Sequence, residues 1–201
     1  MSIMLISVAD AKSFLEIDES ISTFDTLLSG IIKGVSARFE LYLNRNLKKE
    51  SRTEYFQAGG RKYFMSAYPI DSTITPTVIL ETTPQTIDED FYVWWDDGTF
   101  EFDYNTSYVG PKQLIITYTG GYPTTTTAIG GTTVSDTLLT SIDSLWYACL
   151  LQVAYVFRRR QDIGLTSVSM PDGSISSAGG MELLAEVKKI LSGLRKTPNE
   201  R

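Results

Sequence analysis

Hydrophobic residues recur at steps of three and four along two parts of the chain, one near its beginning and one towards its end. Over residues 23–43 they form a continuous stripe made of Phe24, Leu27, Leu28, Ile31, Ile32, Val35, Phe39 and Tyr42. This spacing predicts an amphipathic helix. A shorter helix is predicted just before it, because Ser7 and Asp10 have the spacing of a capping box.

Two glycines, Gly30 and Gly34, lie within the predicted helix at 23–43. Each costs roughly 1 kcal/mol of helix propensity relative to alanine. Either the helix tolerates two weak positions, or another helix approaches it closely there, and the sequence leaves both interpretations open.

A second helical zone is predicted after residue 134. Apolar residues are dense from about residue 137 to 160 and cover more than a narrow stripe, which predicts the longest helix of the chain. So wide an apolar surface suits burial against the N-terminal helices on one side and against another subunit on the other. The polar segment 164–180 is predicted to be a loop, and a last helix is predicted at about 181–191.

Residues 51–119, between the helical zones, show β-type patterns. Tyr55-Phe56 and Tyr63-Phe64-Met65 flank Ala58-Gly59-Gly60, which predicts a first hairpin. The clearest hairpin joins residues 91–95 to 99–104 through Asp96-Asp97-Gly98, and its second strand alternates apolar with polar residues, so one face is buried. The Thr/Gly-rich segment 124–133 is predicted to be an exposed loop.

Together these elements predict an α+β fold in which N- and C-terminal helices form a small bundle. Residues 1–50 and 134–201 make up this helical core, and residues 51–123 form an inserted antiparallel β-sheet or small barrel. Residues 124–133 are the loop that leads back to the helices. Since no stretch approaches the ~18 apolar residues of a membrane span, we expect a protein made in the cytoplasm.

The amino-acid composition says little more about the fold, but it excludes several kinds of catalytic and metal-binding site. The 201 residues include no histidine and a single cysteine, Cys149. Without an imidazole, His-dependent triads and His-ligated zinc are excluded, and one cysteine cannot form an internal disulfide. We therefore expect no catalytic residue, no metal and no cofactor, and hence a protein that is not an enzyme.

The charge balance disfavours a free-standing DNA or anionic-membrane binder, which needs a basic face. The chain holds 18 Lys+Arg against 24 Asp+Glu, a formal net charge of −6. The surplus negative charge lies in residues 51–135, which carry 4 basic and 10 acidic side chains.

Local candidates for binding chemistry are weak. Asp88-Glu89-Asp90 with Asp96-Asp97 could supply oxygen ligands to a hard cation or a metal-dependent hydrolase, but their spacing is not that of an EF-hand and Asp-Gly is typical of a hairpin turn. A second group of residues could stack sugars or bases, although such aromatics are more often sheet core or interface anchors: Tyr92, Trp94, Trp95 and Tyr108. A glycan- or ligand-binding module on the aromatic β zone is therefore the alternative function.

The order of several short motifs adds a resemblance to a known family. In chain order the motifs are Ser7–Ile17, Phe39–Leu47, Tyr68-Pro69-Ile70, Asp90–Val93, Ile116–Pro123, Arg158-Arg159-Arg160 and Leu184–Leu191, with Leu194-Arg195-Lys196 after them. Together they resemble the head–tail connector (adaptor) proteins of tailed bacteriophages over nearly the whole chain. The Thr-rich segment 124–133 is longer than this family leads us to expect.

The resemblance implies a structural protein of the virion, located at the head–tail junction after synthesis in the host cytoplasm. It implies a homo-oligomeric ring, typically of twelve copies, bound beneath the portal protein. The ring would continue the DNA channel and present a platform to a downstream neck or tail-completion protein. DNA would pass through without specific binding, and no membrane would be involved.

Two groups of residues are predicted to make the contacts of such a ring. Large side chains of the long helix are the predicted subunit-interface anchors: Trp146, Tyr155 and Phe157. Basic side chains are the predicted contacts to the portal or another partner, where they would tune assembly rate and salt dependence: Arg158, Arg159, Arg160, Lys188, Lys189, Arg195 and Lys196.

Overall fold

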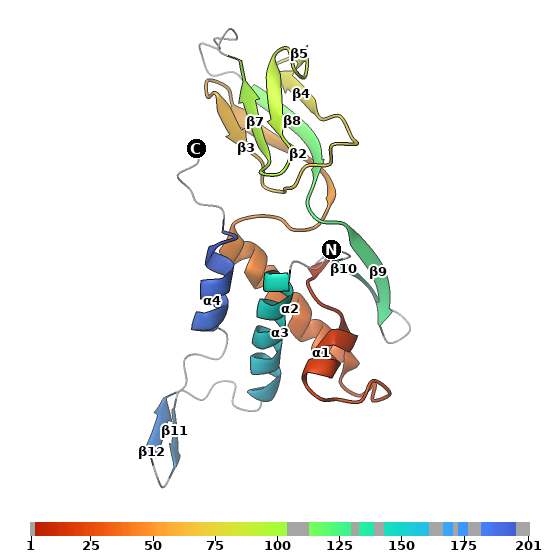
Figure 1. Cartoon of the computed structure of the whole chain (residues 1–201), viewed down its shortest axis with the longest axis vertical. Coiled ribbons are helices and arrows are strands. Elements are labelled where there is room, and N and C mark those ends of the chain that lie inside the picture. The colour runs from red at the N-terminus through yellow and green to blue at the C-terminus, as the bar shows by residue number, and fades with distance from the viewer. Residues whose placement is uncertain are drawn as a thin grey trace. The chain divides into compact units, whose positions relative to one another are not determined.

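The computed structural model describes residues 3–103, 113–129, 133–138, 143–160, 167–170, 173–176 and 182–195. They form an α+β fold with antiparallel sheets, so the predicted fold class is confirmed (Figure 1). The chain divides into two compact units. The first comprises Met1–Leu43 and Thr125–Arg195, and the described residues of the second are 44–103 and 113–124. Within the described residues, no helix is long and apolar enough to cross a membrane.

The first unit is built around four helices: α1 (Val8–Phe14), α2 (Asp25–Leu43), α3 (Asp143–Arg158) and α4 (Ala185–Ser192). The predicted capping box at the start of α1 is present. The Asp10 N–H donates to Ser7 Oγ at 3.0 Å, and the Ser7 N–H donates to the Asp10 carboxylate at 2.9 Å. Two of the donors that a helix start leaves unpaired are thereby satisfied.

The core of this unit lies along one side of α2, which packs against α3, α1 and α4. The buried apolar side chains of α2 recur at helical spacing: Leu28, Ile32, Val35, Phe39 and Leu43. The first described residues of the chain, Ile3–Ile6, are also buried. Leu5 N–H donates to Ser36 Oγ at 3.1 Å, which fixes this N-terminal segment against α2.

Residues 124–138 correct two predictions at once. The Thr/Gly-rich segment expected to be a loop contributes β9 (Thr124–Ile129), and β10 (Thr133–Leu138) occupies the expected start of the second long helix. The prediction that this helix is the longest was wrong, because α3 has 16 residues and α2 has 19. β10 pairs in parallel with β1 (Ile3–Met4), giving the order β1-β10-β9. Threonine favours strands because it is β-branched, and the pairing partner comes from the far end of the sequence.

The predicted polar loop at 164–180 also contains strands. β11 (Ser167–Met170) and β12 (Gly173–Ser176) form an antiparallel hairpin, in which Val168 pairs with Ile175. The prediction of a loop here was wrong, because it rested on polarity, and an antiparallel pair needs no apolar run to form its backbone hydrogen bonds.

The second unit consists of two antiparallel sheets that share one core. One sheet has the order β2-β8-β4-β5, made of β2 (Glu50–Gln57), β8 (Gln113–Gly120), β4 (Thr77–Leu80) and β5 (Thr83–Gln85). The other has the order β3-β7-β6, made of β3 (Lys62–Phe64), β7 (Thr99–Phe102) and β6 (Phe91–Trp94). Aromatic residues dominate the core between them, including Tyr63, Phe91, Phe100, Phe102 and Tyr118.

One predicted hairpin of this unit is confirmed and the other is wrong. β6 and β7 pair as predicted, with Phe91 opposite Phe102, and Gly98 in the turn has a φ of 73°. β2 and β3, in contrast, do not pair with each other: β2 pairs with β8 and β3 with β7. The Ala58-Gly59-Gly60 turn therefore carries the chain from one sheet to the other.

A buried tyrosine of β8 contacts both the neighbouring strand β2 and the segment that follows β3. Tyr118 Oη donates to the Glu54 carboxylate at 2.5 Å and accepts the Ala67 N–H at 3.0 Å. Burial and the neighbouring Glu54 raise the pKa of the Tyr118 hydroxyl above its usual value. The hydroxyl therefore stays protonated and can keep donating to Glu54.

We predict that Tyr118→Phe destabilises the protein by about 1–3 kcal/mol, because it leaves the buried Ala67 N–H without an acceptor. Urea denaturation followed by tryptophan fluorescence measures this change. Tyr55→Phe is the matched control, because Tyr55 lies on the same sheet with 65% of its surface exposed and should change stability by less than about 0.5 kcal/mol. Equal effects of the two substitutions would contradict the assignment.

Candidate functional site

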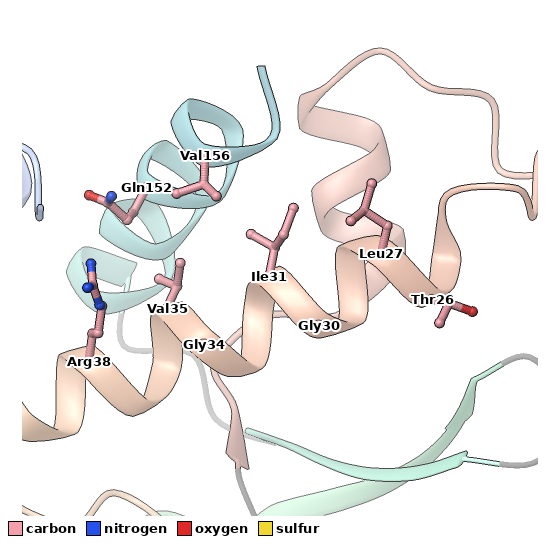
Figure 2. A pocket seen from close by; sticks show the side chains of 9 residues that line it. All are labelled: Thr26, Leu27, Gly30, Ile31, Gly34, Val35, Arg38, Gln152 and Val156. Atoms are coloured by element: carbon pink, nitrogen blue, oxygen red, sulfur yellow. The ribbon is translucent and has the colours of Figure 1, made fainter. Parts of the chain in front are cut away.

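A groove runs along α2 beside its buried stripe, and the buried Val35 belongs to both. It has a volume of about 380 Å³. Its lining comes from α2 and α3: Thr26, Leu27, Gly30, Ile31, Gly34, Val35, Arg38, Gln152 and Val156. Figure 2 shows Leu27, Ile31 and Val35 projecting from α2 on the side where Gln152 and Val156 of α3 lie. The groove is therefore mainly apolar and belongs wholly to the first unit.

The two glycines of α2 face open space in this groove. A Cβ atom added at Gly30 or at Gly34 meets no atom within 4 Å. Close approach of another helix was one of two interpretations of these glycines, and no described helix of this chain approaches them. Leu27, one turn before Gly30, is 42% exposed. Nothing within the described chain therefore compensates the cost of the glycines to helix stability.

Polar side chains mark the two boundaries of the groove. The Gln152 amide at its α3 wall is satisfied, because it donates to the Glu182 carbonyl at 3.2 Å and accepts the Leu184 N–H at 2.9 Å. The Arg38 guanidinium at the C-terminal end of the groove has no ion-pair or hydrogen-bond partner among the described residues. One end of an apolar groove thus carries an uncompensated positive charge.

A second open surface lies on α3, formed by three residues spaced four apart, which we call the α3 ridge: Tyr147, Leu151 and Tyr155. Tyr147 is 44% exposed, and the other two are half-buried. Asp143 lies one turn before the ridge and Arg158 less than one turn after it, and both are exposed. Tyr147 was not among the predicted anchors, although its spacing from Leu151 and Tyr155 was visible in the sequence.

The three predicted subunit-interface anchors occupy different environments. Tyr155 lies on the α3 ridge and Trp146 is half-buried on another side of the helix. Phe157 is 7% exposed and packs edge-on against Phe24, with ring centroids 5.6 Å apart. Phe157 thus contributes to the core of its own unit.

The arginines at the end of α3 are not equivalent. Arg159 Nη1 donates to Tyr155 Oη at 2.7 Å, and Arg160 Nη1 donates to the Phe157 carbonyl at 2.6 Å. The Arg160 guanidinium also lies 4.1 Å from the centre of the Phe157 ring. Arg158 is the exposed member of the three. Two of the three arginines therefore stabilise their own helix end, where cations also complement the helix dipole.

The structure does not gather the predicted basic residues into one patch. Arg160 lies over the Phe24 ring, just before α2 begins, whereas Arg195 lies over the Tyr42 ring, in the last turn of α2. At 1.5 Å per residue these two positions are about 27 Å apart. Lys188 and Lys189 are exposed on α4. Lys196 lies outside the described residues.

Two of the acidic residues considered for a metal site accept backbone hydrogen bonds in turns. Asp90 accepts the Thr86 N–H at 2.7 Å, and Asp97 accepts the Thr99 N–H at 2.9 Å. In the part of the chain that the structure describes, no group of three His, Cys, Asp or Glu residues could hold a metal ion. Burial raises the pKa of the Cys149 thiol, which keeps it protonated.

The aromatic residues considered for stacking are divided between surface and core. Tyr92 and Trp94 are 47% and 55% exposed and lie on the same face of β6. Trp94 Nε1–H donates to Glu101 at 3.2 Å, and Arg61 pairs with the same carboxylate at 2.8 Å. Trp95 packs against the core, and Tyr108 lies outside the described residues. The exposed pair is therefore smaller than the predicted platform.

We predict that Gly34→Ala stabilises the isolated protein by about 0.4–1 kcal/mol, because alanine favours the helix and meets no neighbour. Gly120→Ala is the matched comparison. Its Cβ would lie 2.4 Å from the Ala67 carbonyl oxygen, so it should destabilise the protein by roughly 1–3 kcal/mol. Thermal unfolding at low protein concentration tests both, and a loss of stability in Gly34→Ala would show that the groove is filled in the isolated chain.

Comparisons with known proteins address the family. The family model described as "Head completion protein" matches residues 4–196. No curated protein sequence matches this chain. A chain in the structure titled "Neck of empty GTA particle computed with C6 symmetry" is similar over 96% of this chain and 90% of that chain, with 14% identity and a TM-score of 0.57.

A second solved structure, titled "Virion of native gene transfer agent (GTA) particle", contains a chain with 13% identity and a TM-score of 0.55 over 96% of this chain and 90% of that one. At such identities the two structures establish a likeness of fold. The family match itself spans nearly every described residue. The chain therefore belongs to the head completion protein family, which confirms its resemblance to phage head–tail connector proteins and gives it a structural role at the phage head–tail junction.

Proposed function

We propose that the protein is a ring-forming head–tail connector. Identical copies bind beneath the portal protein, extend the DNA channel and join the head to a neck or tail-completion protein. The observation that carries this proposal is the pair of open surfaces on the helical unit, the groove of α2 and the α3 ridge. A head completion protein that exposes two different apolar surfaces can bury both at the same time only by binding two neighbouring molecules.

Two different contact surfaces on one chain produce head-to-tail contacts, and such contacts close into a ring when the rotation between copies permits it. One structural neighbour belongs to a particle neck computed with C6 symmetry. A ring of twelve copies is compatible with a sixfold axis. This supports the expected stoichiometry, in which Trp146 and Tyr155 contribute to the contact between subunits.

The charge of the protein suits a channel through which DNA slides. The net charge is −6, and acidic residues exceed basic ones most strongly in residues 51–135. Tight DNA binding requires basic side chains that neutralise phosphates and release counterions. A ring of such chains passes DNA without holding it, and it acts as a structural part rather than as an enzyme.

The exposed basic residues supply a contact to the portal. Arg159 and Arg160 make hydrogen bonds within their own helix, and Arg158 is the arginine of the three that is exposed. Lys188 and Lys189 form a separate exposed group on α4. The predicted contacts to the portal include Lys188 and Lys189, and we assign the portal contact to this α4 group.

We predict that the purified protein forms rings, either alone or when mixed with purified portal. Sedimentation velocity measures the size of the assembly, and negative-stain images show its shape. Rings stacked coaxially on portals are the expected result. A chain that stays monomeric at high concentration and never joins portals would contradict the proposed function.

We predict that Lys189→Glu slows association with the portal by about tenfold, because exposed charges at the edge of an interface act mainly on the association rate. The salt dependence of that rate should also become shallower. Lys62→Glu serves as the control, because Lys62 is an exposed lysine on the second unit, 50% accessible. Association rates measured by surface plasmon resonance at several salt concentrations test this prediction. Identical rates for the two variants would show that α4 does not contact the portal.

A further inference from the structure

We propose that the groove of α2 is the acceptor site for a second copy of this chain, and that the neighbour's α3 ridge occupies it. This assignment rests on the proposed ring. It names which surface of one copy meets which surface of the next, and it gives Gly30 and Gly34 a function.

The shape of the groove favours a helix as its occupant. Glycines in a helix allow the backbone of a neighbouring helix to come close, because no Cβ stands between them. Here both glycines face open space, and Leu27 and Ile31 flank them with apolar surface. A neighbour's helix seated over the glycines would bury this apolar surface and explain why two costly residues occupy one helix face.

The α3 ridge has the dimensions that this groove requires. Leu27 and Arg38 are eleven residues apart, about 16 Å along α2, and Tyr147 and Tyr155 are eight residues apart, about 12 Å along α3. The three ridge side chains therefore fit between the two ends of the groove. Tyrosine and leucine are also large enough to fill space left open by glycine.

Charge selects the direction in which the ridge enters. Arg38 is half-buried at one end of the groove, and the exposed Asp143 lies one turn before Tyr147. Neither side chain has an ion-pair partner among the residues that the structure describes. Placing the neighbour's Asp143 next to Arg38 makes the two helices antiparallel and pairs two charges that the described residues leave unpaired.

The contact is head-to-tail because the groove and the ridge occupy different sides of α3. Gln152 and Val156 line the groove, and each follows a ridge residue by one position, a rotation of about 100° around the helix. A copy whose groove is filled still presents its own ridge to the next copy. The same contact can therefore repeat around the whole ring.

The test fills the groove without disturbing the fold. Gly34→Leu adds a side chain where a Cβ meets nothing within 4 Å, so the monomer should fold and remain helical by circular dichroism. We expect it to reduce ring formation by about tenfold or more, alone or on the portal, as the loss of a central interface contact does. Gly193→Leu is the matched control, because Gly193 also has no atom within 4 Å of an added Cβ and lies outside the groove.

A charge exchange tests the partner and the direction. Arg38→Asp and Asp143→Arg should each weaken assembly, and the double variant should recover it, because the new pair has the same geometry with the signs reversed. Failure of the double variant to recover any assembly would overturn the pairing of these two ends.

The remaining outcomes separate this inference from the proposed function. If the wild-type protein forms rings and Gly34→Leu forms them equally well, the groove is not the acceptor site although the ring stands. If Gly34→Leu forms rings but no longer binds the portal, the groove belongs to the portal instead. If the wild-type protein forms only a closed dimer or never assembles, both proposals fail, because a twofold pair would bury the same surface on both copies.

Discussion

The packing of α2 against α3 is the interaction on which the rest of the helical unit depends. α2 buries Leu28, Ile32 and Phe39 completely, and α3 buries Leu145, Cys149 and Val153. Because a helix presents its residues all around its axis, burying one stripe in the core leaves the opposite stripes exposed. The α3 ridge and the groove of α2, apart from the buried Val35 and Gln152, belong to these remaining stripes. Core packing therefore determines which side chains remain available to other molecules.

The glycines of α2 allow the stability of the single chain and its assembly to be changed independently, which few core residues allow. Gly30 and Gly34 lower the stability of the helix, and a Cβ added at either position meets no atom of the described residues within 4 Å. Gly120 and Gly121, in contrast, are required by the chain itself, because a Cβ at either position would lie within 2.6 Å of a backbone oxygen. A glycine that the packing of its own chain does not require, and that lies in an apolar groove, is evidence that another molecule packs against it. This distinction needs coordinates, since both kinds look alike in the sequence.

The sequence predicted correctly those elements whose contacts join residues close together in the chain. The capping box at Ser7, the stripe of α2 and the β6–β7 hairpin each depend on residues a few positions apart, and all three were predictable. β10 depends on Ile3 and Met4, more than 130 residues away by its register with Asp136 and Thr137, and no local pattern shows such a pairing. The same limit applies to the candidate site. Dense apolar residues predicted exposed apolar surface on α3, but only the fold shows that Phe157 faces the core and Tyr147 faces outward.

The positions of the potentially reactive side chains support a function based on binding other molecules. Cys149 is buried and kept protonated, Asp90 and Asp97 hold turns, and Glu54 is occupied by Tyr118 and Ser66. These potentially reactive groups are thus committed to the fold. The second unit encloses a hydrophobic core of its own that is rich in aromatic residues. The helical unit exposes Leu27, Tyr147 and Arg158, and apolar and charged side chains of this kind gain free energy by meeting another surface.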